Sequence, residues 1–157
     1  SSAASDVYKR QVDYNDYCGL KCVIYRKDEY SLGTTPWVNG IDFDIALNSL
    51  TLTVIDSIVV QLSGFCALSN AQRMTDVPPI NKKGLLKVVD SESYIGGTGS
   101  FRIHNMDMPI YLNSQTGWLC IGYPRKVGIA VEFIDDCIFV IGKKQEFVSL
   151  WIHPTFI

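Results

Sequence analysis

The chain has 157 residues and carries 14 Lys or Arg against 16 Asp or Glu, for a formal net charge of −2. A domain of about this length buries roughly 68–70 % of the surface that its unfolded chain exposes, so the chain can hold a substantial core. Hydrophobic residues make up 47 % of the chain and charged residues 19 %, which is typical of a globular protein and excludes general disorder. The near-neutral charge supplies no positive field for phosphates, so nucleic acid is not an expected partner.

The first eleven residues, SSAASDVYKRQ, resemble translated sequencing-adapter read-through. We therefore expect residues 1–11 to be a non-native N-terminal extension and residues 12–157 to form a single β-rich domain. An ordinary disordered terminus rich in Ser and Ala is the alternative interpretation.

Apolar side chains then recur with a period of two, as they do on a half-buried strand. Ile41, Phe43 and Ile45 alternate with two aspartates, and residues 50–54 alternate Leu or Val with Thr. Further short apolar runs follow after turn-forming residues. The longest apolar stretch, from Ala46 to Leu68, is interrupted by polar side chains, so we do not expect it to insert into a membrane.

A polar stretch from 69 to 84 comes next, and we expect a loop there because Pro78-Pro79 lacks the N–H groups of a central strand. Apolar runs resume at 85–89, 100–104, 110–112, 118–121, 129–134, 137–141 and 147–152. Residues 129–141 predict a hairpin that turns at Asp135-Asp136. About ten short strands at this spacing predict an all-β fold, an antiparallel sandwich or barrel. No repeat of fixed period is visible, although residues 51–62 and 129–141 share a general pattern.

Five cysteines are an odd number, so at least one thiol is free. Cys18 and Cys22 would lie about 13 Å apart on an extended strand, which is too far for a disulfide. Cys66, Cys120 and Cys137 each lie inside an apolar run, and we expect them to be buried and reduced. Reduced thiols suit synthesis in a reducing cytoplasm.

The sequence predicts no metal site, no cofactor and no enzyme activity. Only two histidines are present, His104 and His153, and they are far apart in sequence. Asp42 and Asp44 would share a strand face and could act as acid and base or bind a cation, but solvent exposure explains them more simply. Residues 96–99, Gly-Gly-Thr-Gly, lack the Lys and hydroxyl residue of a phosphate-binding loop, which indicates a turn.

Aromatic side chains are the candidate ligand contacts, because a flat ring packs against the apolar face of a sugar. Trp37 and Tyr123 stand beside prolines and Tyr94 stands near glycines, which places all three in predicted turns. Tyr111 and Trp118 lie within predicted strands, where packing in the core is the competing role. We therefore predict Trp37, Tyr94 and Tyr123 as ligand-binding residues. The basic pair Arg125-Lys126 is interpreted, like the other basic pairs, as a solvated turn.

The stretch from Leu50 to Gly142 resembles the distal β-rich modules of bacteriophage tail fibres. The resemblance depends on the order of LTLTV, a Pro-containing loop, KKGLLKVVD, GTGSFRI and VEFIDDCIFVIG. It implies a homotrimer whose subunits cover one another's strand edges, with tip loops that bind a host surface glycan or protein. It also implies a place on a virion or outside the cell after cytoplasmic synthesis. Without the resemblance, a cytoplasmic location is expected.

The leading hypothesis is a non-enzymatic attachment or recognition module of a viral or phage appendage. Three alternatives stay open: a structural or accessory subunit of a larger assembly, a barrel that binds a small apolar ligand, and a hydrolase that uses Asp42 or Asp44. The oligomeric state and the strand order would distinguish the attachment module, expected to be an edge-sharing trimer, from a closed monomeric barrel.

Overall fold

The computed structural model of the chain describes residues 24–26, 31–33, 43–66, 68–88, 100–103 and 106–156. These residues form strands, loops and one short 3-10 helix, so the predicted all-β fold is confirmed. In this part of the chain no helix is long and apolar enough to cross a membrane. In chain order the elements are β1 (Ile24–Arg26), β2 (Ser31–Gly33), β3 (Phe43–Leu47), β4 (Leu50–Ile55), β5 (Ile58–Phe65), η1 (Leu68–Asn70), β6 (Gln72–Arg73), β7 (Lys82–Lys83), β8 (Ser100–Arg102), β9 (Ile110–Leu112), β10 (Leu119–Gly122), β11 (Ile129–Ile134), β12 (Cys137–Ile141), β13 (Phe147–Ile152) and β14 (Thr155–Phe156).

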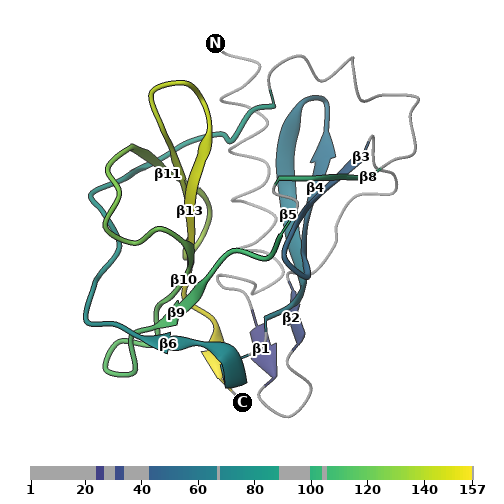
Figure 1. Cartoon of the computed structure of the whole chain (residues 1–157). Helices are drawn as coiled ribbons and strands as arrows, with labels where there is room; N and C mark the ends of the chain where they lie inside the picture. The colour runs from purple at the N-terminus through teal and green to yellow at the C-terminus, as the bar shows by residue number, and fades with distance from the viewer. Residues whose placement is uncertain are drawn as a thin grey trace.

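The strands make two sheets that face each other (Figure 1). Sheet A has the strand order β14-β1-β2-β5-β4-β3-β8, and sheet B has the order β6-β9-β10-β13-β12-β11-β7. Neither order returns to its first strand within the described residues, so the architecture is a sandwich and not a closed barrel. The central pairs are antiparallel, as predicted, whereas the outermost pair at each edge is parallel.

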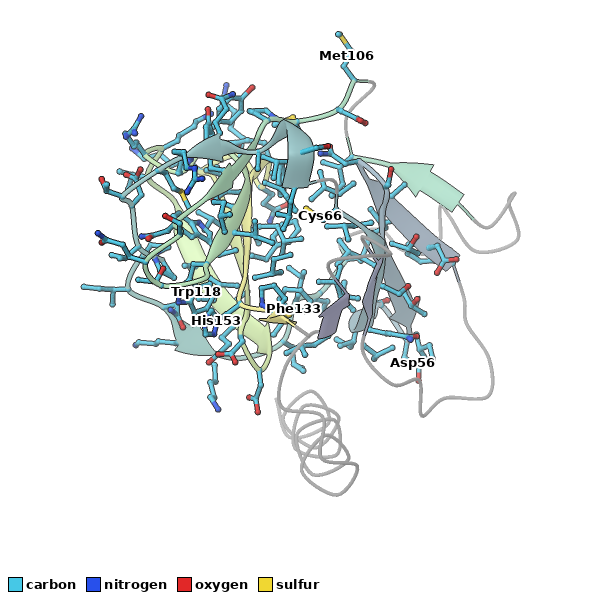
Figure 2. All side chains as sticks on the ribbon, turned by 90° about the horizontal axis from the view of Figure 1, so that it is seen from below. Asp56, Cys66, Met106, Trp118, Phe133 and His153 are labelled. Carbon is cyan, nitrogen blue, oxygen red and sulfur yellow. The ribbon has the colours of Figure 1, made fainter. Side chains whose placement is uncertain are left out.

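A hydrophobic core lies between the sheets. Sheet A contributes Leu52 and Leu62 and sheet B contributes Ile121 and Leu150, all of them fully buried. Burial of one such side chain stabilises the fold by about 1.5–3 kcal/mol. Phe133 lies in the same core, between the two sheets in Figure 2. The period-two spacing of these residues is what directs them to one face of each strand.

The outer face of sheet B is also buried. Cys120, which alternates with the core residues of β10, packs there with Ile138, Val140 and Trp151. Met74 completes this second cluster from the segment that links β6 to β7. Because β6 and β7 occupy opposite edges of sheet B, the residues between them, 74–81, must cross its outer face (Figure 1). We call residues 74–81 the strap.

The strap is nearly extended. Six strand spacings separate β6 from β7, a width of about 29 Å at roughly 4.8 Å per strand. Nine residue steps from Arg73 to Lys82 reach about 30–32 Å at most. Pro78-Pro79 favours this extended backbone, in agreement with the predicted loop. The flanking Gln72–Arg73 and Lys82–Lys83 nevertheless pair as short edge strands, which need partners on one side only.

The two sheets share one topology. Strands β1 to β6 match β9 to β14 in order, in pairing partner and in pairing direction. The predicted hairpin at residues 129–141 is confirmed as β11 and β12, with Asp136 at a φ of 62° in its turn. In the other sheet, the hairpin equivalent to β11–β12 is β3–β4. Residues 51–62 belong to β4 and β5, so their sequence likeness to residues 129–141 does not mark equivalent strands.

The described cysteines, Cys66, Cys120 and Cys137, are buried and form no disulfide among the described residues, as predicted. Burial raises the pKa of the Cys66 thiol to about 12. Burial also raises the pKa of Cys120, and the nearby Asp76 carboxylate raises it further, against a hydrogen bond to Ser149 that lowers it. Both thiols therefore stay protonated and act as small apolar side chains. Cys18 and Cys22 lie outside the described residues.

Candidate functional site

Tyr123 is the one predicted ligand-binding residue among the described residues, since Trp37 and Tyr94 lie outside them. Its side chain is 46 % exposed in the loop that follows β10. The Tyr123 amide donates to the Val148 carbonyl, and the Lys126 amide donates back to the Tyr123 carbonyl, which closes a tight turn. The Lys126 ammonium lies 5.9 Å from the centre of the Tyr123 ring, within the range of a cation–π contact.

A surface cleft of about 320 Å³, lined mainly by polar residues, lies at the start of the strap. Three segments form its walls: the end of β6 with the first strap residues, the β9–β10 loop, and the β10–β11 loop. Its lining consists of Arg73, Met74, Thr75, Asn113, Ser114, Gln115 and Arg125. We call this the strap cleft.

Asn113 holds two of these walls together. Its side chain is buried, and its Nδ2 donates to the Asp76 carbonyl on the strap at 2.9 Å. Its Oδ1 accepts from the amides of Gln115 at 3.1 Å and Thr116 at 3.3 Å. The Asn113 amide donates to the Trp118 carbonyl, so the β9–β10 loop is closed on itself. One buried amide therefore fixes the strap against the loop.

Arg125 enters the strap cleft from the β10–β11 loop. Its Nη2 lies 3.2 Å from Oδ1 of Asp76, and its side chain is mostly exposed. An exposed pair of this kind contributes about 0–1 kcal/mol to stability, so its main effect is to orient the guanidinium. Arg73 at the end of β6 is the second arginine of the lining.

Sequence reasoning missed the strap cleft. Arg73, Asn113 and Arg125 come from three separate segments, and no spacing motif connects them. The predicted solvated turn at Arg125-Lys126 is confirmed, since both residues are exposed in the β10–β11 loop. In addition, Arg125 lines the cleft and Lys126 lies over Tyr123.

Trp118 and His153 form a second polar cluster (Figure 2). Their rings stack with centres 4.9 Å apart, and Nε2 of His153 lies 2.8 Å from the Thr116 carbonyl oxygen. Nδ1 of His153 lies 4.0 Å from a carboxylate oxygen of Asp136. Burial raises the pKa of Asp136, and the nearby Glu132 and Asp135 raise it further, while His153 and Lys83 lower it. The carbonyl contact and the stacked indole give this histidine a structural role.

The remaining sequence candidates do not converge on a reactive centre. Asp44 lies on β3, whereas Asp42 and His104 fall outside the described residues. One carboxylate oxygen of Asp44 is buried without a hydrogen-bond partner in the described structure, and Asp44 lines neither the strap cleft nor the cavity considered next. Within the described ranges, no group of three or more His, Cys, Asp or Glu is placed to hold a metal ion.

An apolar cavity of about 350 Å³ lies between the sheets, and we call it the inter-sheet cavity. Its lining comprises Ile45, Leu52, Val59, Leu86, Lys87, Val88, Ile103, Phe139, Ile141, Gln145 and Phe147. Nine of these eleven side chains are apolar, so the cavity suits a hydrocarbon-like occupant better than a polar one.

The fold and these two hollows define an all-β sandwich with a polar surface cleft and an apolar inter-sheet cavity. Comparison with known protein families finds no family model that matches the chain, and comparison with curated proteins finds no match either.

Proposed function

We propose that this chain is a non-enzymatic attachment or recognition module of a viral or phage appendage, and that it binds a host surface glycan. The observation that carries the proposal is the strap cleft, whose guanidinium, hydroxyl and amide groups suit hydrogen bonding to a hydroxylated ligand. Tyr123 stands two residues from Arg125 and offers an exposed ring for stacking on a sugar.

The surroundings of the strap cleft support recognition. Its walls stand on a sheet buried on both faces, so a ligand meets groups that are already held in place. The hydrogen bonds of Asn113 hold the strap and the β9–β10 loop before any ligand arrives.

Binding of the purified full chain to a printed array of bacterial surface polysaccharides and animal-cell glycans tests the proposal. We expect binding to a defined subset, and Tyr123→Ala should weaken it. Tyr111→Phe, which keeps the ring of a half-buried residue on the same sheet, is the matched control. Absence of binding across the array, or equal binding by Tyr123→Ala, would refute glycan recognition at this surface.

We also propose that the module is a homo-oligomer, with a trimer favoured. β7 pairs in parallel with β11, with Lys82 opposite Val131, and Ile80 and Ile129 each precede this pair by two residues. Ile80 is 99 % exposed, Ile129 is 76 % exposed, and the neighbouring Val127 is 89 % exposed. Exposed apolar side chains at one sheet edge are typical of an association surface.

Light scattering of the full chain over a range of concentrations tests the association. If the wild-type chain is a trimer and Ile129→Lys is a monomer, the result would support association through this sheet edge. Val77→Lys on the strap adds the same charge elsewhere and should leave the trimer intact. A wild-type chain that is monomeric at high concentration would end the oligomer proposal.

A small apolar ligand is a second candidate occupant of the molecule, and the inter-sheet cavity favours it. Titration with the fluorescent probe anilinonaphthalene sulfonate should then show enhancement that dodecanoate displaces and that Val59→Phe, which fills the cavity, reduces. An unchanged signal in Val59→Phe would remove this candidate.

A further inference from the structure

We propose that the strap cleft recognises an anionic group on a hydroxylated ligand, which makes the ligand an acidic sugar of a surface polysaccharide. The inference rests on the proposed glycan recognition and gives it a chemical class. Its basis is that two arginines line one cleft together with neutral residues that carry hydroxyl and amide groups.

The charges in the strap cleft favour an anion. Arg73 and Arg125 contribute two positive charges, and Asp76, which pairs with Arg125, contributes one negative charge. The contact with Asp76 uses Nη2 of Arg125 at 3.2 Å. A guanidinium has five N–H donors, so both arginines keep donors for a ligand, and their planar geometry matches the oxygens of a carboxylate or phosphate.

The neutral lining favours a sugar over a bare ion. Thr75, Ser114 and Gln115 line the same cleft and can each donate and accept hydrogen bonds, which is what ring hydroxyls require. A carboxylate ion such as acetate has only acceptor oxygens to offer at neutral pH. The volume of about 320 Å³ lies near the lower end of ligand pockets, roughly 300–1,000 Å³, and suits one or two sugar rings.

Calorimetric titration of the full chain tests the inference with four probes: an oligoglucuronate, a glucose phosphate, a neutral glucose oligomer of the same length as the oligoglucuronate, and sodium acetate. We expect at least one of the two acidic sugars to bind about tenfold or more tightly than both the neutral oligomer and acetate. Which acidic sugar binds more tightly identifies the anion as carboxylate or phosphate.

Arg73→Gln should lower the affinity for the preferred acidic sugar about tenfold or more, because a charge-assisted hydrogen bond is lost. Lys143→Gln removes the same charge from the exposed β12–β13 loop, outside the cleft lining, and should change the affinity little. Both substituted residues are exposed, and matching thermal unfolding curves would show that both variants fold.

Equal affinity for the acidic and neutral sugars, or equal losses in Arg73→Gln and Lys143→Gln, would overturn anion recognition in the strap cleft. Acetate that binds as tightly as the acidic sugars would overturn the sugar part. These results would leave glycan recognition intact if the array still shows binding, whereas an array without binding would refute the proposed function itself.

Discussion

Asn113→Ala should release the strap from the β9–β10 loop. The substitution removes one hydrogen bond to the Asp76 carbonyl and two from the amides of Gln115 and Thr116. A typical hydrogen bond contributes about 0.5–1.5 kcal/mol, and a backbone group left unpaired in a buried site costs more. Because the site is only partly buried and water can satisfy some of these groups, we expect the free energy of unfolding to fall by about 2–4 kcal/mol.

Asn81→Ala is the matched control for this measurement. Asn81 is at the other end of the strap, and its side chain donates one hydrogen bond, at 3.0 Å, to the Pro79 carbonyl two residues away. Loss of this single local bond should cost about 0.5–1.5 kcal/mol.

Urea unfolding followed by tryptophan fluorescence gives both free energies. Amide hydrogen exchange should show faster exchange at Met74, whose amide donates to the Leu112 carbonyl beside Asn113, in the Asn113 variant alone. Equal destabilisation by the two variants, with unchanged exchange at Met74, would refute the conclusion that Asn113 fixes the strap.

Three further predictions concern the fold and its ionisable groups. Gly64→Ala should destabilise the fold by about 2–4 kcal/mol, because Gly64 has a φ of 117° and a Cβ would collide with the Ser49 carbonyl. Gly84→Ala, where a Cβ meets only one methyl group of Val131 at 3.2 Å, should cost less than about 1 kcal/mol in the same urea titration. The raised pKa of Asp136 means that the folded state holds its proton more tightly than the unfolded state, so the contribution of Asp136 to stability is complete below about pH 3.9 and is lost as the pH rises through the folded pKa. Asp136→Asn should therefore flatten that part of the stability–pH curve, and an unchanged curve would contradict the assignment. In a variant with Cys18→Ser and Cys22→Ser, the three remaining thiols should react with Ellman's reagent slowly in the native state and rapidly in urea, and fast native reaction would show that they are accessible.

Much of the fold could be predicted from local pattern because side chains on a strand alternate between two faces. The alternation of Ile129, Val131 and Phe133 is followed by the polar pair Asp135-Asp136 and then by a second apolar run. This pattern was sufficient to place the β11–β12 hairpin. Pro78-Pro79 excludes a central strand and predicts a loop, and the structure shows that part of this loop is the strap. The edge strands β6 and β7 were not predicted, because two exposed residues with one-sided pairing leave no apolar pattern.

The sequence also carries a signal for the burial of both faces of sheet B, because some of its strands are apolar at successive positions and not only at every second one. β10 and β12 read LCIG and CIFVI, runs that are apolar without interruption, and continuous apolar runs are typical of strands covered on both sides. That signal indicates a cover over the outer face but not which segment supplies it. The strap cleft could not be predicted either, since Arg73, Asn113 and Arg125 meet only because the strap crosses the sheet where it does.

The matching topology of the two sheets also explains how they are joined. β6 follows β5 of sheet A along the chain but pairs with β9 in sheet B, whereas β14 follows β13 of sheet B but pairs with β1 in sheet A. Each half of the chain thus donates one edge strand to the other half. Such an exchange opposes separation of the two halves of the chain, because separation breaks two ladders in addition to exposing the shared core. Of the two donated strands, β6 leads directly into the strap, so the same crossing that joins the sheets also builds the cleft wall at Arg73 and Thr75.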